Sequence, residues 1–247
     1  KHWIVKFFSA SFFTISGSFL YLNFFKPING TTGNPSRSQI ILAYSYFVFP
    51  YPFFPVTISK NLGDFTEVKV YNGIELELIE STESKLVITG NKSEKVTIKN
   101  IDNTLKIALP FSINPENNSA SGEVLVKLFY NNPIAIIDAN EGATITGKKI
   151  TQDILEVNAQ ERVLLIGIET KYLKVRASSG GIIKLTGTTK TQEVSVDLYG
   201  IYNGYGLKVF TNTDVKSGTG AKAEIFAGET LKAKVSFGGS IFYKGNP

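Results

Sequence analysis

The chain has 247 residues, a formal net charge of +5, no cysteine and one histidine. This length suffices for a buried core in one or two domains. The lack of cysteine excludes disulfides and thiolate metal sites, and His2 alone excludes a multi-histidine zinc site and a histidine-based catalytic triad. Lysine and glutamate are interspersed along the chain without a basic cluster among stacking aromatics, so we expect no nucleic-acid partner.

The first apolar stretch covers residues 4–25 and follows the basic Lys1. A basic start before an apolar run resembles a secretory signal, and the run is almost long enough to span a bilayer. Strands packed on the rest of the protein are the alternative. We therefore expect a signal, an anchor with membrane contact, or a folded segment, followed by a polar linker at residues 29–39.

A second aromatic block at residues 40–56 contains Pro50, Pro52 and Pro55. Prolines this close together exclude a helix interior and a central strand. The block is expected to cap one end of the following domain, and an exposed docking surface is the alternative. Its candidate cap or docking residues are Tyr44, Tyr46, Phe47, Phe49, Tyr51, Phe53 and Phe54. Residues 1–60 thus form an N-terminal segment, and residues 61–247 form a β domain.

Short alternating strands begin at Phe65. Asn72-Gly73 lies between two alternating runs and predicts a tight turn. Further strands are expected near residues 86–88, 96–98, 105–107 and 123–130, and residues 112–122 have the composition of a loop. Sustained helical periodicity is absent from the sequence after residue 60, so the domain is predicted to be all-β.

From Ile134 onward a unit of two alternating strands, a small-residue turn and a glycine repeats. The unit glycines are separated by intervals of 20, 20, 19, 22 and 17 residues, at Gly147, Gly167, Gly187, Gly206, Gly228 and Gly245. A period near 20 with two strands per unit predicts a parallel β-solenoid, in which small residues align along one edge. A β-sandwich of short hairpins is the alternative.

The acidic residues of the repeats give no catalytic pattern. The candidates are Asp138, Glu141, Glu156, Glu161, Asp197 and Asp214. They lack the close Asp-x-Asp spacing expected of a calcium or acid/base cluster, and the chain has no phosphate-binding loop. We therefore predict no catalytic residue, no metal site and no cofactor.

One unit departs from the small-residue pattern between Leu198 and Tyr205. It contains Tyr199, Tyr202 and Tyr205, and tyrosine offers a flat contact area together with a hydroxyl group. These three residues are the predicted binding site. The alternative is that they pack between coils or fill a corner.

Residues 175–187 and 235–247 are small-residue units, and residues 65–78 and 103–107 are alternating strands. The two units resemble the repeats of the head GIN domain family of auto-transporter adhesins. Residues 65–78 resemble the opening strands of that family, and residues 103–107 resemble a strand that follows them. The resemblance covers residues 62–247 and implies a right-handed β-helix, export to the envelope of Bacteroidetes-type bacteria, and no known catalytic role. Family repeats usually continue past the closing Gly-x-Pro, which implies that the chain is truncated at Pro247.

These observations predict a non-enzymatic module of the cell envelope, located in the periplasm, the outer membrane or at the cell surface. Its expected role is adhesive, structural or interactive, with other envelope proteins or surface glycans as partners. One alternative is a subunit of a larger outer-membrane assembly, docked through the aromatic N-terminal segment. The other is a polysaccharide-degrading enzyme of the β-helix type.

Overall fold

The computed structural model describes residues 56–58, 62–90, 92–110 and 124–247, and these contain 17 strands and one 3-10 turn, η1, at Ser93–Lys95. The strands before the repeats are β1 Val56–Ile58, β2 Glu67–Tyr71, β3 Glu75–Glu80, β4 Lys85–Gly90, β5 Thr97–Ile101, β6 Thr104–Ala108 and β7 Val124–Tyr130. The repeats contain β8 Ile136–Ala139, β9 Thr144–Lys148, β10 Thr151–Ala159, β11 Arg162–Ala177, β12 Ile182–Val196, β13 Ile201–Val209, β14 Asn212–Ser217, β15 Lys222–Ala227, β16 Thr230–Val235 and β17 Ser240–Gly245.

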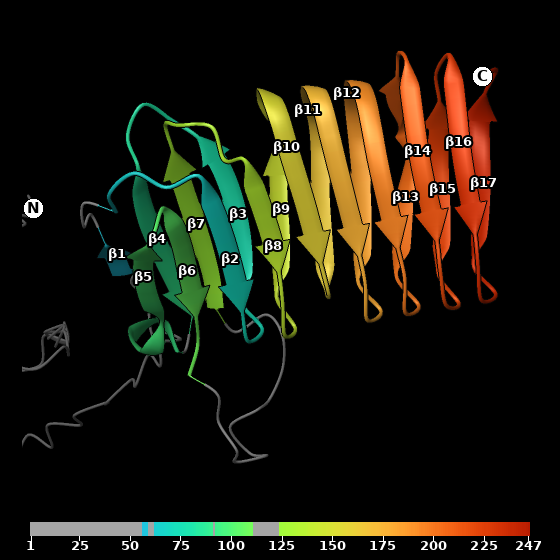
Figure 1. Cartoon of the computed structure of the whole chain (residues 1–247). Coiled ribbons are helices and arrows are strands. Elements are labelled where there is room, and N and C mark those ends of the chain that lie inside the picture. The colour runs from blue at the N-terminus through green and yellow to red at the C-terminus, as the bar shows by residue number, and fades with distance from the viewer. Residues whose placement is uncertain (1–55, 59–61, 91, 111–123) are drawn as a thin grey trace, which may run out of the picture. The chain divides into compact units, whose positions relative to one another are not determined.

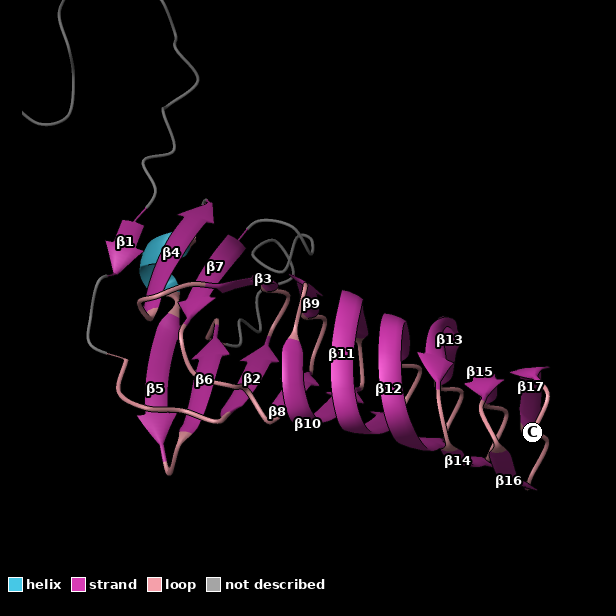
Figure 2. Ribbon diagram, turned by 90° about the horizontal axis from the view of Figure 1, so that it is seen from above, coloured by secondary structure: helices cyan, strands magenta, loops and turns pink. Residues whose placement is uncertain are grey.

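The strands form a parallel β-solenoid with two faces, and its coils lie in a row (Figure 1). Face A consists, in spatial order, of β5, β6, β2, β8, β10, the second halves of β11 and β12, β14 and β16. Face B consists of β1, β4, β7, β3, β9, the first parts of β11 and β12, β13, β15 and β17. Figure 2 shows β11 and β12 curving from one face to the other. The solenoid prediction is confirmed, and the sandwich alternative is not the observed fold.

Rows of apolar side chains run along the interior, because alternate residues of each strand point inward. One row of face A reads Leu105, Val68, Ile137, Val157, Val175, Val194, Val215 and Ala233. All of these except Ala233 are almost completely buried. From Ile137 the intervals along this row are 20, 18, 19, 21 and 18 residues, close to the predicted period. The row therefore supplies the hydrophobic core that holds successive coils together.

The coils are not stacked in the order of the sequence. The β2–β3 coil lies between the coil of β6 and β7 and the coil of β8 and β9. After β3 the chain runs outward through β4 and β5, which pair antiparallel with β7 and β6, before it returns to β8. Six consecutive coils, from β8 to β17, then follow in order.

Tight turns join face A to face B at one corner in most of the described coils. In five turns the amide of the fourth residue donates to the carbonyl of the first, as Gly181 does to Ser178. These turns begin at Asn140, Ser178, Asp197, Gly218 and Ser236. Both central residues have positive φ in four of them. The predicted turn at Asn72-Gly73 also has positive φ at both central residues, but β2 and β3 do not pair with each other, so the turn forms a coil corner.

Val56–Ile58 pairs with β4 of the solenoid, and the division between residues 1–60 and 61–247 stays a prediction. The predicted signal or anchor at residues 4–25, the aromatic cap or docking residues and the loop at residues 112–122 lie outside the described residues. Within the described part of the chain, no helix is long and apolar enough to cross a membrane.

Candidate binding surface

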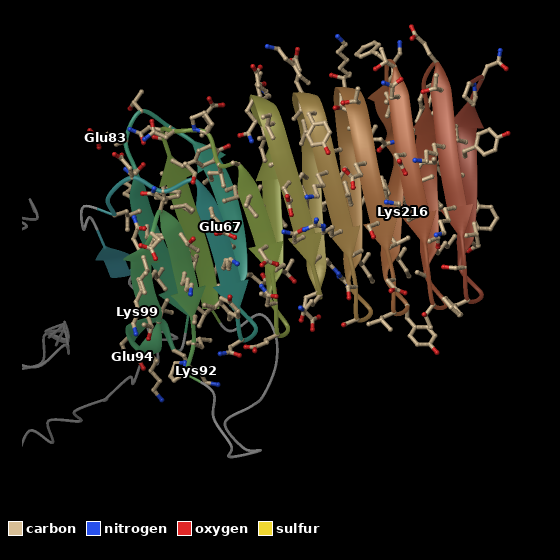
Figure 3. The ribbon with its side chains drawn as sticks, in the orientation of Figure 1. Glu67, Glu83, Lys92, Glu94, Lys99 and Lys216 are labelled. Carbon is tan, nitrogen blue, oxygen red and sulfur yellow. The ribbon has the colours of Figure 1, made fainter. Side chains whose placement is uncertain are left out.

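Face A carries two outward rows of polar and charged side chains (Figure 3, in which Glu67 and Lys216 are labelled). The first row reads Glu67, Ile136, Glu156, Lys174, Glu193, Asp214 and Lys232. The second row reads Lys106, Lys69, Asp138, Asn158, Arg176, Ser195, Lys216 and Lys234. Parallel stacking in register produces these rows, because each outward residue lies beside its counterpart in the next coil.

Glu156 is the centre of one charge network. Its carboxylate lies 3.3 Å from Lys174 Nζ and 3.0 Å from Arg176 Nη1, and it accepts a 3.1 Å hydrogen bond from Asn158 Nδ2. Its side chain is only 19% exposed, so these partners are screened less than a fully exposed pair would be. The network fixes the position of the Arg176 guanidinium.

Lys69 is the centre of a second network, 3.0 Å from Glu67 and 3.8 Å from Asp138. The hydrogen bond with Glu67 raises the pKa of Lys69. Burial alone would raise the pKa of Glu67, but the Thr104 hydroxyl and Lys69 outweigh burial and lower it. Burial raises the pKa of Asp138, although Asn140 and Lys69 oppose this shift. Glu67 is thus held as a carboxylate, and Asp138 is the less well solvated of the two.

A depression of about 200 Å³ lies where these networks meet the corner of the solenoid. Its lining residues are Asp138, Asn140, Asn158, Ala159, Gln160, Arg176 and Ser178. Two buried polar atoms there, Asn140 Nδ2 and Asn158 Oδ1, have no hydrogen-bond partner. The Asn140 amide lies close enough to the Asp138 carboxylate to favour its ionised form, but the pair does not reach hydrogen-bond geometry. Unpaired buried polar atoms are costly in proteins, so the depression is the most unusual polar feature of face A.

The three predicted tyrosines do not share a surface. Tyr202 is fully buried, its hydroxyl lies 3.3 Å from Gln192 Oε1, to which it donates, and burial raises its pKa strongly. Tyr199 is 70% exposed at a corner turn, with its ring above Gly220. Tyr205 is half-buried and contacts Lys244, whose Nζ lies 4.4 Å from the ring centroid. Tyr202 fills the interior and cannot contact a ligand, whereas ligand binding by Tyr199 and Tyr205 stays a prediction.

The other acidic candidates are dispersed along the solenoid. Asp197 accepts hydrogen bonds from the amides of Leu198 at 2.8 Å and Thr219 at 2.7 Å, which lower its pKa. Asp214 pairs with Lys232 at 3.4 Å. Glu141 lies in a corner turn. In the residues for which positions are described, no three His, Cys, Asp or Glu side chains form a metal-binding group.

Comparison with known proteins identifies the family. Residues 64–247 match the model described as "Putative auto-transporter adhesin, head GIN domain", which is well over half of the chain. The chain belongs to this family. The family resemblance seen in the sequence is thereby confirmed. No curated protein matches the chain.

Solved structures share the fold of this GIN domain. A "putative adhesin" from Bacteroides fragilis has a TM-score of 0.62 at 14% identity, covering 77% of this chain and 96% of its own. A "putative adhesin" from Parabacteroides distasonis has a TM-score of 0.55 at 19% identity, covering 78% and 94%. A "putative lipid binding protein" from the same species has a TM-score of 0.51 at 15% identity, covering 77% and 97%. At these identities the similarity shows the fold alone.

The depression in the GIN domain was not predicted from the sequence, although a signal was present. Three coils carry a polar–Ala–polar triplet at the same position, namely Asp138–Asn140, Asn158–Gln160 and Arg176–Ser178. Strand alternation places the first polar residue of each triplet outside and the alanine inside, and the second polar residue follows the end of the strand. The register aligns the three triplets side by side.

Proposed function

We propose that this GIN domain is a non-catalytic binding module of the bacterial cell envelope, exported and presented in the periplasm, the outer membrane or at the cell surface. Its face A is the proposed contact surface for glycans or other envelope proteins. Membership of an adhesin head family supports an adhesive role. A row of outward side chains repeated at each coil also suits an extended partner.

The pairing of carboxylates with cations on face A is the observation that carries this proposal. Glu156 is held by Lys174 and Arg176, and Glu67 is held by Lys69. A general acid must carry a proton, and the Thr104 hydroxyl and Lys69 hold the pKa of Glu67 below its ordinary value, which does not suit that role. This arrangement suits recognition by a fixed charge pattern better than hydrolysis of a glycosidic bond, which is the alternative function.

Incubation of the full chain with envelope and plant polysaccharides tests the proposal. We expect the protein to co-sediment with at least one polymer and to release no reducing ends. Time-dependent release that disappears in Glu156→Gln would show a polysaccharide-degrading enzyme instead. Loss of the protein from the envelope fraction of cells would contradict the proposed location.

A further inference from the structure

Two buried atoms in the depression on face A, one donor and one acceptor, have no hydrogen-bond partner. Asn158 Nδ2 donates a hydrogen bond to the Glu156 carboxylate, so the unpaired atom of the Asn158 amide is the acceptor Oδ1. Asn140 lies beside another carboxylate, Asp138, so the atom that faces it is the donor Nδ2. A ligand that completes this site must therefore accept from Asn140 and donate to Asn158.

Asn140 is held in a fixed position in the wall of the depression. It is 8% exposed, so more than nine-tenths of it is buried. Its backbone amide donates to the carbonyl of Val70, and its carbonyl accepts from Ala143, which fixes the residue on the corner turn. Its unpaired amide lines the depression at a defined position.

The charges around the depression favour a neutral ligand. The Asp138 carboxylate disfavours an anion, and Arg176 together with Lys69 disfavours a small cation. Arg176 shares its charge with Glu156 through one nitrogen and keeps its remaining donors for other contacts. A ligand with neighbouring hydroxyl groups donates and accepts hydrogen bonds without net charge. Such groups can pair with the side chains of Asp138, Asn140, Asn158 and Arg176.

The size of the depression limits the ligand to one small unit. The depression has a volume of about 200 Å³. A single six-membered sugar ring suits this space. The depression opens on face A, so further rings of a chain can extend across the face.

We propose that the depression is a subsite for one neutral sugar residue. Asn140 donates to one hydroxyl oxygen, Asn158 Oδ1 and the Asp138 carboxylate accept from hydroxyl groups, and Arg176 donates to a further oxygen. This subsite rests on the proposed binding function, because it names the ligand class that face A recognises.

Titration calorimetry of the full chain with methyl glycosides of glucose, galactose, mannose and N-acetylglucosamine tests the subsite. We expect at least one neutral glycoside to saturate a single site. Asn140→Ala and Arg176→Ala should each weaken that binding about tenfold or more, because each removes a hydrogen bond made only with the ligand. Ser195→Ala, in the same outward row but outside the depression, is the matched control and should bind as the unmodified chain does.

Thermal unfolding distinguishes loss of the site from loss of the fold. Asn140 Nδ2 has no partner without ligand, so Asn140→Ala should unfold at the same temperature as the unmodified chain or a higher one. Saturation by none of the glycosides, equal binding by Asn140→Ala, or preference for glucuronate would overturn the subsite. If the protein still co-sediments with polysaccharide in those cases, the binding function stands without this subsite, whereas failure of both contradicts the function itself.

Discussion

Two adjacent glycines in one corner turn, Gly180 and Gly181, serve different physical needs. Gly180 has φ of +82°, and a Cβ there would meet no atom within 4 Å. A Cβ on Gly181 would lie 2.2 Å from the carbonyl oxygen of Ala159 in the preceding coil. Gly180 is therefore favoured by backbone conformation, and Gly181 is required by the close approach of two coils.

Replacement of each glycine by alanine separates these needs. We expect Gly180→Ala to cost about 1 kcal/mol, the strain of a left-handed alanine. Gly181→Ala should cost about 3 kcal/mol or more, because it forces two backbones apart. Urea denaturation of the full chain measures both free energies of unfolding. Equal costs would contradict the close contact between coils.

Asp197 is predicted to make stability depend on pH. Its carboxylate accepts two backbone amides, from Leu198 and Thr219 on neighbouring turns, so its folded-state pKa lies below the ordinary 3.8. The stabilisation is complete above that ordinary value and is lost as the pH falls through the lowered folded-state pKa. Thermal unfolding across this acidic range should show the loss.

Two variants test the role of Asp197. Asp197→Asn keeps an acceptor oxygen without a titrating proton, so the acid-dependent loss of stability should become smaller. Asp197→Ala removes the acceptor and should also lower the unfolding temperature at neutral pH. An unchanged acid profile in Asp197→Asn would show that other carboxylates cause the acid sensitivity.

At the scale of strands, a buried polar cluster ties β12, β13, β14 and β15 together. Gln192 Nε2 donates to the carbonyl of Phe226 at 3.0 Å and to the Thr213 hydroxyl at 3.3 Å, while Gln192 Oε1 accepts from Tyr202. Gly204 leaves space for the Tyr202 ring, since a Cβ there would lie 2.5 Å from that ring. Within the unit that departs from the small-residue pattern, Tyr202 is thus part of the core.

Removal of the Tyr202 hydroxyl tests this cluster. Tyr202→Phe leaves Gln192 Oε1 buried without its donor and should cost about 1 kcal/mol. Tyr205→Phe on the outer side is the matched control and should change the free energy of unfolding little. Denaturation midpoints of both variants provide the comparison, and equal midpoints would contradict the buried hydrogen bond.

Strand alternation explains which inward-facing residues of β7 and β13 could be predicted from the sequence. It correctly predicted a strand at residues 123–130, where β7 buries Val124, Val126 and Leu128 on one face. The same rule separates Tyr202 from Tyr205, because residues three apart on a strand point to opposite sides. The binding prediction grouped these tyrosines by composition and overlooked that spacing.

At the scale of the whole solenoid, the period near 20 was sufficient to predict stacked coils. The spatial order of the first coils could not be predicted, because strands β2 to β7 lack a repeat that fixes which neighbours pair. The depression depends on the register of three coils, and register follows from packing of the whole interior row. The repeat period therefore predicted the scaffold, whereas the site depends on the three-dimensional stacking.

The out-of-order stacking can be measured directly between Lys106 and Lys216, which are exposed residues of the same outward row. Six coil steps of about 4.8 Å separate them, or about 29 Å between Cα atoms. Lys69 lies one step nearer to Lys216, at about 24 Å.

Because the chain contains no cysteine, pairs of introduced cysteines can carry spin labels at chosen positions only. Double electron–electron resonance on Lys106→Cys/Lys216→Cys and on Lys69→Cys/Lys216→Cys would give both distances. The solenoid predicts the longer distance for the Lys106 pair, by about one coil step. A longer distance for the Lys69 pair, or distances that do not follow the coil spacing, would contradict the stacked parallel solenoid on which the binding surface depends.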